Sequence, residues 1–221
     1  RVALDLLFPP QCAVCRAGGS VLCDLCVALL PLAEPPRCVR CWDDIRTGSR
    51  CPPCAAAPPA FVAVRSPYVH ADAARDLVHL FKYEGLTSLA RPMASLMVAS
   101  ARALPADLVV PVPLHRGRQR ARGYNQATLL AGHLARDMGL PCDPRAARRI
   151  RATKPLAKSM SREERSSIVA GAFGADPVRA EGRVVLLVDD VVTTGATLDA
   201  CARALLDAGA RQVRAVTFVH A

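Results

Sequence analysis

Beyond the first 60 residues, apolar and polar positions follow patterns that predict strands and helices in alternation. Residues 61–68 alternate between apolar and polar side chains, as expected of a strand. Residues 73–83 have the apolar spacing of an amphipathic helix, and Gly85 is a plausible C-cap. A longer helix is expected within 86–104, where Pro92 begins or interrupts it.

The second half of the chain continues this alternation. The apolar run 108–114 predicts a strand that stops at a Pro-x-Pro turn, and a helix follows over 125–138. Five apolar residues at 184–188 predict a buried strand, residues 198–206 a helix, and residues 212–220 a final strand. Together these elements predict an α/β fold with a mainly parallel, twisted sheet flanked by helices.

The first 60 residues lack this periodicity and contain proline pairs at 35–36, 52–53 and 58–59 that disfavour helices. A chain of 221 residues is long enough for one α/β domain plus a small module. We therefore expect a small N-terminal domain over 1–60 and an α/β domain over 61–221, joined by a linker near 55–60.

Four Cys-x-x-Cys pairs fall within the small domain. Each pair aims two sulfur atoms at one point, and two pairs complete a tetrahedral S₄ site, so eight cysteines predict two structural zinc ions. Trp42, beside the third pair, is expected to anchor a small core rather than to stack on bases. The predicted ligands are Cys12, Cys15, Cys23, Cys26, Cys38, Cys41, Cys51 and Cys54.

Two other uses of these cysteines have to be weighed. Disulfides suit secreted proteins, which this chain does not otherwise resemble, and iron–sulfur clusters also use four cysteines. Sequential pairing of the Cys-x-x-Cys motifs is the simplest arrangement, but the spacing leaves a crossed pairing open.

The formal charge of +10 favours anionic partners such as polyphosphates or nucleic acid. Eight thiolates on two zinc ions would lower that charge by four. No apolar run approaches the roughly 18 residues of a membrane span, and no signal-peptide pattern opens the sequence, which starts with Arg1. We expect a cytoplasmic protein, with any membrane association made through its partners.

The segment 184–197 has the strongest chemical signal. A buried strand leads through Asp189 and Asp190 into Thr-Thr-Gly-Ala-Thr, and a helix follows. Backbone N–H groups at a helix N-terminus bind phosphate, and Gly195 allows close approach of the backbone. Carboxylates would repel a phosphate, so the pair indicates a ligand that also carries a diol or a divalent cation.

A second anion site is indicated after the strand 108–114. Arginines occupy alternate positions of 116–122, a segment expected to be a glycine-bearing loop. These arginines either converge on a dense anion such as pyrophosphate or form a merely solvated basic loop. Lys82 is either a solvated helix end or an anion ligand, and Asn125 either a helix N-cap or a ligand contact. The segment 145–165 is also strongly basic.

The aspartate–threonine segment resembles the phosphoribosyl-pyrophosphate (PRPP) signature of type I phosphoribosyltransferases. Together with the cysteine-rich head, Phe-Lys-Tyr-x-Gly, Pro-Val-Pro-Leu and Arg-Gly-Tyr-Asn-Gln, it occurs in the order found in the ComF family and its GntX-like relatives. These competence-associated proteins combine a zinc-ribbon head with a type I phosphoribosyltransferase-like core. The resemblance covers nearly the whole chain.

The resemblance implies a role for each motif. Asp189, Asp190 and Arg162 would serve the reaction centre, with Mg²⁺ carried by PRPP, and 145–165 would close over the diphosphate. Leu156, where the family has Gln, and Ser-Ile after Arg165, where it has Asn, depart from the pattern. The implied PRPP-binding residues are Lys82, Pro113, Arg116, Arg122, Asn125, Val191, Thr193, Thr194, Gly195, Ala196 and Thr197.

Three functions fit these residues. The first is a phosphoribosyltransferase that releases pyrophosphate and acts in single-stranded DNA uptake during natural transformation. The second is a non-catalytic PRPP sensor or scaffold that engages single-stranded DNA or a helicase partner. The third is a salvage-type phosphoribosyltransferase with an unknown acceptor. The sequence does not fix the oligomeric state.

Overall fold

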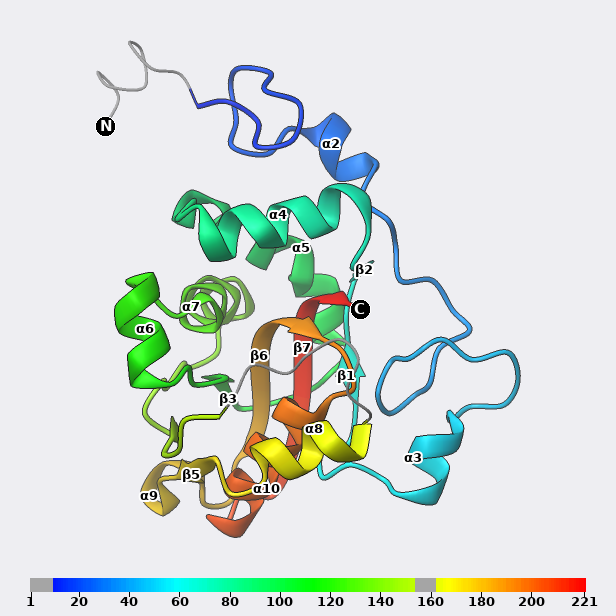
Figure 1. Ribbon diagram of the computed structural model, residues 1–221, viewed down its shortest axis with the longest axis vertical. Coiled ribbons are helices and arrows are strands. Elements are labelled where there is room, and N and C mark those ends of the chain that lie inside the picture. Colours follow the sequence, from blue (N-terminus) through cyan, green and yellow to red (C-terminus); the bar gives the residue numbers. More distant parts are fainter. Residues whose placement is uncertain (1–9, 154–161) are drawn as a thin grey trace.

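A parallel sheet forms the centre of the computed structural model, which describes residues 10–153 and 162–221 (Figure 1). The long strands β6 (Val184–Val192) and β7 (Gln212–His220) pair in parallel, and β3 (Leu108–Pro111) extends the sheet beyond β6. On the other edge, the short strands β1 (Val64–Arg65) and β2 (Tyr68–Val69) both pair with β7. The strand order is therefore β1/β2–β7–β6–β3, with every pairing in this sheet parallel.

Alternation along β6 divides the core into two layers. Leu186 and Val188 contribute to one buried cluster, and Val185 and Leu187 to the other. The helices α4 (Asp72–Tyr83), α5 (Ala90–Arg102) and α7 (Gln126–Met138) cover the first face, with the 3₁₀ turn η1 (Thr87–Leu89) before α5. Helix α10 (Ala196–Asp207) covers the second face. This arrangement confirms the predicted α/β class with a parallel sheet and flanking helices.

Smaller elements complete the second layer. The antiparallel pair β4 (Ala147–Arg149) and β5 (Phe173–Ala175) packs beside α10. Helices α8 (Arg162–Val169) and α9 (Pro177–Ala180) contact the same helix. In Figure 1, α8 crosses in front of the lower part of the sheet, close to α10.

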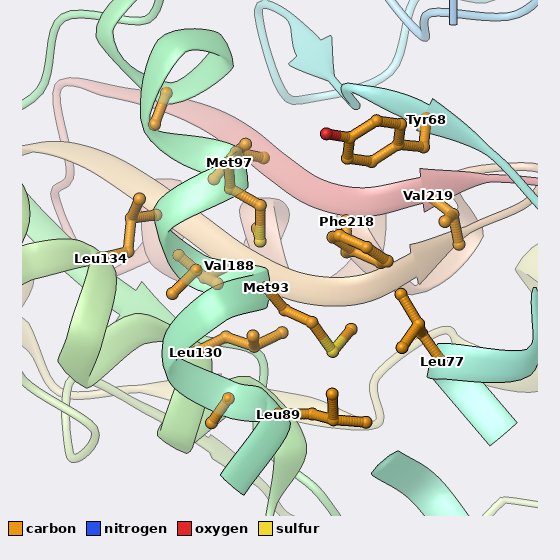
Figure 2. Packing of buried hydrophobic residues seen from close by; sticks show 14 of the residues in the cluster. Tyr68, Leu77, Leu89, Met93, Met97, Leu130, Leu134, Val188, Phe218 and Val219 are labelled. Carbon is orange, nitrogen blue, oxygen red and sulfur yellow. The ribbon is translucent and has the colours of Figure 1, made fainter. Parts of the chain in front are cut away.

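The first layer is packed by long, unbranched side chains from α5 and leucines from α7. Met93 and Met97 of α5 are fully buried, as are Leu130 and Leu134 of α7. Figure 2 shows these side chains over Val188 of β6 and Phe218 of β7. Each fully buried side chain of this size stabilises the fold by about 1.5–3 kcal/mol relative to an exposed one.

Several predicted boundaries change for physical reasons. The strand expected over 61–68 is broken into β1 and β2, with Ser66 and Pro67 between them. The segment 116–122, expected as a loop, forms helix α6 (Arg116–Arg122). Nδ1 of His115 accepts a bond from the N–H of Gly117 at its start, and Gly123 (φ 87°) ends it in the left-handed conformation.

The cysteine-rich segment covers the edge of the sheet at β1 and β2, and contains the short helices α2 (Asp24–Ala28) and α3 (Pro52–Ala56). The backbone N–H of Val64 donates to the carbonyl of Arg40 at 2.7 Å, and that of Val69 to Pro31 at 2.9 Å. An open sheet edge is otherwise a site for unwanted pairing. The N-terminal segment therefore completes the hydrogen bonding of the edge strand.

Trp42 anchors this contact. Its Nε1 donates to the carbonyl of Ser66 at 2.8 Å, and the guanidinium of Arg65 lies 4.4 Å from the centre of its ring. The Trp42 side chain is half-buried and makes both a hydrogen bond and a cation–π contact. These contacts are expected of a residue that anchors a small core rather than of a platform that stacks on bases.

Within residues 10–153 and 162–221, no helix combines the length and the apolar character that crossing a membrane requires.

Candidate functional site

The eight cysteines of the Cys-x-x-Cys pairs form two clusters of four. In each cluster the sulfur atoms all lie within 4.8 Å of one another. The Cys15 and Cys23 sulfurs are 3.6 Å apart, and those of Cys41 and Cys51 are 3.5 Å apart. These separations exceed the roughly 2.05 Å of a disulfide and approach the roughly 3.8 Å between ligands of a tetrahedral Zn–S₄ centre.

The clusters group the cysteines in sequence order, which resolves the open question of pairing. One cluster contains Cys12, Cys15, Cys23 and Cys26, and the other contains Cys38, Cys41, Cys51 and Cys54. Four thiolates close the coordination shell and leave no position for a reactive water, so both sites suit structural zinc.

The two clusters differ in their exposure to solvent. All four cysteines of the second cluster are buried and belong to the core on the α10 face. In the first cluster, Cys15 is exposed and Cys23 is half-buried. The first cluster is therefore the more accessible to chelators.

A polar cavity of about 240 Å³ lies where β3 and β6 end. Val112 still donates its N–H to Val188 at 2.9 Å, but Pro113 has no N–H, so pairing with β6 stops there. Strand β6 runs on to Val192, which leaves its last residues free on that side. The cavity is lined by Lys82, Tyr83, Val112, Pro113, Leu114, Arg118, Arg122, Asn125, Gln126, Arg149, Asp189, Asp190, Val191 and Thr197.

The adjacent aspartates lie within β6 rather than after it, so their side chains point to opposite faces of the sheet. Asp190 faces the α4 layer, where Nζ of Lys82 lies 2.9 Å from its Oδ2. The Lys82 and Asp190 side chains are 20% and 6% exposed. Lys82 is thus not a solvated helix end, because it forms an ion pair at the cavity wall, and its contact with a bound anion stays a prediction.

The electrostatics of this group follow from its burial. Burial alone would lower the pKa of Lys82, but the carboxylates of Asp190 and Asp189 outweigh that effect and raise it. Burial and the charge of Asp190 raise the pKa of Asp189 to about 8, although Lys82 acts in the opposite direction. A further cation near Asp189 would favour its ionised form, so the site suits a ligand that donates hydrogen bonds or brings a cation.

Helix α6 sorts its four arginines into two pairs. Residues four apart share a helix face, and Arg118 and Arg122 both line the cavity. Arg118 donates to the carbonyl of Thr153 at 2.9 Å, and Arg122 to Oε1 of Gln126 at 2.7 Å. Arg116 and Arg120 are exposed and contribute no lining residue to the cavity.

The segment between β6 and α10 has the expected turn. Gly195 adopts φ 77° as the N-cap of α10, and a Cβ there would lie 3.3 Å from the ring of Phe61, so only glycine fits without strain. Thr197 and Val191 line the cavity. The segment therefore turns sharply into the N-terminus of α10 beside the cavity.

The remaining residues of this turn lie just outside the cavity. Thr194, Gly195 and Ala196 line a neighbouring hollow of about 680 Å³ along α10. Oγ1 of Thr194 is buried and has no hydrogen-bond partner among the described residues. Exposed Thr193 accepts a bond from Arg165 of α8 at 2.8 Å.

Asn125 has a structural role at the cavity wall. Its Oδ1 caps α7 by accepting from the N–H of Ala127 at 3.1 Å, and its Nδ2 donates to the carbonyl of Val112 at 3.0 Å. The predicted N-cap is confirmed, and the same residue lines the cavity.

The basic segment 145–165 is described only in part. Arg162 begins α8, but its side chain lies outside what the structure describes, and Leu156 lies outside the described residues. Arg149 of β4 lines the cavity and also bonds Oγ1 of Thr153. Buried Arg165 reaches the turn before α10.

Six of the lining residues were not among the predicted PRPP-binding residues: Tyr83, Val112, Leu114, Arg118, Gln126 and Arg149. Arg118 would have been found by applying helical periodicity to 116–122, because it lies one turn before Arg122. Tyr83 stood in the Phe-Lys-Tyr motif, but nothing in the sequence set its direction. Gln126 ends the Arg-Gly-Tyr-Asn-Gln motif and Arg149 lies in the basic segment 145–165, but nothing in the sequence directed either side chain to the cavity.

Comparison with known proteins agrees with this architecture. Residues 3–57 match the double zinc ribbon domain, and residues 125–221 match the phosphoribosyl transferase domain. These matches confirm the predicted zinc-ribbon head and the phosphoribosyltransferase-like core.

Curated relatives extend the similarity along the chain. Over 223 residues the chain is 30% identical to the DNA utilization protein YhgH of Escherichia coli, covering 95% of this chain and 96% of that protein. It is 32% identical to competence protein F of Haemophilus influenzae over 62% of this chain, and 31% identical to competence protein ComFC of Bacillus subtilis over 71%. These alignments span 64% and 63% of the two competence proteins.

The difference in exposure between the clusters predicts two rates of zinc release. Wild-type protein should contain two zinc ions, and a chelator should remove one quickly and the other slowly, because only the first cluster has an exposed ligand. Release is followed with a colorimetric zinc indicator. Cys15→Ser should abolish the fast phase and Cys41→Ser the slow one, and release of both ions in a single phase would contradict this assignment.

The raised pKa of Asp189 predicts a stability that falls as pH rises. Between pH 3.8, the ordinary pKa of an aspartate, and about pH 8, the Asp189 carboxyl is protonated in the folded state and ionised in the unfolded state. Its contribution to the free energy of unfolding is therefore fully present below pH 3.8 and is lost as the pH rises through about 8. Without Mg²⁺ or ligand, Asp189→Asn should exceed wild type in free energy of unfolding at pH 8 by about 1 kcal/mol or more.

Urea unfolding at pH 5 and pH 8 measures this difference, which should shrink at the lower pH. Asp76→Asn is the control, because the Asp76 side chain is 63% exposed. An equal pH dependence in wild type and Asp189→Asn would show that the pKa of Asp189 is not raised.

Proposed function

The chain belongs to the ComF family of proteins with a double zinc ribbon and a phosphoribosyltransferase domain, and from this premise we propose that its cavity binds Mg–PRPP. The observation that carries the proposal is the combination of charges around that cavity. Two carboxylates of β6 lie at its floor, and Arg118, Arg122 and Arg149 contribute to its walls. A ligand with a diol and several phosphates satisfies both sets of groups, whereas a simple anion would be repelled by the acids.

The aspartates would hold the ribose. Carboxylate oxygens accept hydrogen bonds from neighbouring hydroxyls, and a cation brought by the ligand would lower the raised pKa of Asp189 and favour its ionised form. One or two carboxylates together with substrate phosphates also suit Mg²⁺, which keeps much of its oxygen shell from water and substrate. The donor set therefore fits a magnesium ion that arrives with the ligand, and such an ion would neutralise phosphate charge.

The turn before α10 would hold the 5′-phosphate. It combines the N-terminus of a 12-residue helix with the hydroxyls of three threonines and the backbone of Gly195. The buried hydroxyl of Thr194, which lacks a partner among the described residues, is one donor available to a phosphate. Of the other expected contacts, Val191 lies near the end of β6, Thr193 lies in the turn, and Ala196 and Thr197 begin α10.

The arginines would hold the pyrophosphate. Arg118 and Arg122 present two guanidinium groups from one face of α6, and planar guanidinium groups bind phosphate oxygens in pairs. Pro113 and Asn125 line the same cavity. Arg162, at the start of α8, is proposed to approach the diphosphate, and Arg116 to act from outside the cavity.

Catalysis would depend on position and charge. In a phosphoribosyl transfer, the bond from C1′ of the ribose to the pyrophosphate oxygen breaks, a bond to the acceptor forms, and pyrophosphate leaves with the electron pair. The aspartates would support positive charge on the ribose, and the arginines would support negative charge on the leaving group. Histidine is absent from the described lining of the cavity, so the chain presents no histidine general base there.

The names of the relatives connect this activity to DNA. Competence protein F, ComFC and the DNA utilization protein YhgH are the relatives described above. We propose a role in handling single-stranded DNA during uptake, consistent with the +10 formal charge. A helicase partner and a cytoplasmic location remain predictions from the family resemblance.

Calorimetry with Mg–PRPP tests the ligand. Wild type should bind, and the double substitution Asp189→Asn with Asp190→Asn should lower affinity at least tenfold. Arg118→Ala and Arg122→Ala should each lower it about tenfold or more, because a bond to a charged group contributes about 1.5–3 kcal/mol.

Arg120→Ala is the matched control, since it removes the same charge from the opposite face of α6. Its affinity should stay within about twofold of wild type. If Arg120→Ala and Arg122→Ala lowered the affinity for Mg–PRPP equally, only the overall positive charge of α6 would matter. If wild type did not bind Mg–PRPP, the PRPP proposal would be overturned.

A pyrophosphate-release assay separates the enzyme from the non-catalytic scaffold. With Mg–PRPP, candidate acceptors and single-stranded DNA, an enzyme should release pyrophosphate only when an acceptor is present, and Asp190→Asn should abolish that release. A scaffold should bind PRPP and DNA without turnover. DNA binding should weaken steeply as salt rises, because phosphate contacts release counterions.

A further inference from the structure

We propose that Tyr83 and Arg122 form a stacking platform for a nucleobase, in a groove that opens directly from the PRPP cavity. The proposal rests on the proposed function for the position of the ribose. It adds the class of the second ligand. The base belongs either to a free acceptor or product, or to a single strand of DNA.

Three consecutive residues at the end of α4 point in three directions. Successive residues of a helix are about 100° apart. Phe81 is fully buried in the first core layer, and Lys82 forms the ion pair with Asp190. Tyr83 is therefore directed outward, and 65% of it is exposed.

The exposed ring stands at the junction of two hollows. A groove of about 550 Å³ lies beside the PRPP cavity, and Lys82, Tyr83, Arg118 and Arg122 line both. Glu84, Gly85 and Tyr124 are among the other residues of the groove. The groove and the PRPP cavity therefore adjoin at these four residues, so a ligand held in the cavity would lie next to the groove.

The surroundings of the ring suit a flat, electron-rich ligand. The guanidinium carbon of Arg122 lies 5.2 Å from the centre of the Tyr83 ring, and the ring of His79 lies 5.1 Å away on the same helix. Aromatic faces and planar guanidinium groups both stack on nucleobases, whatever the base. Arg122 also bonds Gln126 at 2.7 Å, which restrains the guanidinium group.

Tyr124 packs against the last turn of α4, next to Tyr83. The hydroxyl of Tyr124 bonds the carbonyl of Phe81, and the Phe81 and Tyr124 rings lie 6.0 Å apart. Tyr124 therefore fixes the last turn of α4 from inside. Tyr83 takes part in neither of these two contacts, and 65% of it is exposed.

Calorimetry with matched ligands tests the platform. The probes are ribose 5-phosphate, AMP and UMP, together with a twelve-residue deoxythymidine oligonucleotide and an abasic oligonucleotide with the same number of phosphates. The variants are Tyr83→Ala and Tyr83→Phe, and Val178→Ala is the control because Val178 is 93% exposed and outside both hollows. The readout is the ratio of affinities with and without the base.

In wild type the base should increase affinity, and Tyr83→Ala should reduce the ratio about tenfold or more, as expected for the loss of a stacking ring. Tyr83→Phe should keep the ratio, because it keeps the ring. A Tyr83-dependent ratio for AMP and UMP assigns the platform to a free base or nucleotide. A Tyr83-dependent ratio for the oligonucleotides alone assigns it to a single strand.

The outcomes separate this inference from the proposed function. If wild type binds Mg–PRPP but no base-dependent ratio responds to Tyr83→Ala, the platform is overturned and the PRPP site stands. If wild type binds neither Mg–PRPP nor ribose 5-phosphate but the oligonucleotide ratio still depends on Tyr83, the PRPP site is overturned and the platform stands. A tyrosine that only packs the surface would lower stability without changing any ratio.

Discussion

The buried ion pair between Lys82 and Asp190 joins the end of α4 to the floor of the cavity, and the surrounding geometry depends on it. Nζ and Oδ2 are 2.9 Å apart, and neither side chain is more than 20% exposed. Removing one partner of such a pair leaves an uncompensated buried charge, at a cost of about 3–5 kcal/mol. Because Lys82 is held by this ion pair, its neighbour Phe81 is directed into the core and its other neighbour Tyr83 toward the groove. One contact therefore fixes the direction of both aromatic side chains.

The zinc head is built into the sheet and reaches the turn before α10. It hydrogen-bonds the edge strand through Arg40 and Pro31, and its second cysteine cluster belongs to the α10 core. At its end, the N–H of Ala60 donates to Asp199 of α10 at 2.6 Å, and the ring of Phe61 lies against Gly195. The zinc sites therefore stabilise the edge of the sheet on the side where the proposed phosphate turn begins.

The accuracy of prediction differed between neighbouring residues for clear reasons. The strand before Asp189 and the helix after Asn125 were predictable, because runs of apolar residues report burial directly. Helix α6 was missed because it buries none of its residues and so has no apolar face. Its capping residues, His115 and Gly123, were the signals that could have revealed it.

The sequence by itself determined the α/β class, the eight cysteine ligands and the order of the motifs, because periodicity and spacing are local properties of the chain. Only the tertiary structure decided which cysteines share a cluster, which arginines of α6 line the cavity, and that Lys82 pairs with Asp190. Each of these depends on segments far apart in the chain, brought together by the register of the parallel sheet. Side-chain direction follows from that register, and residue type alone does not specify it.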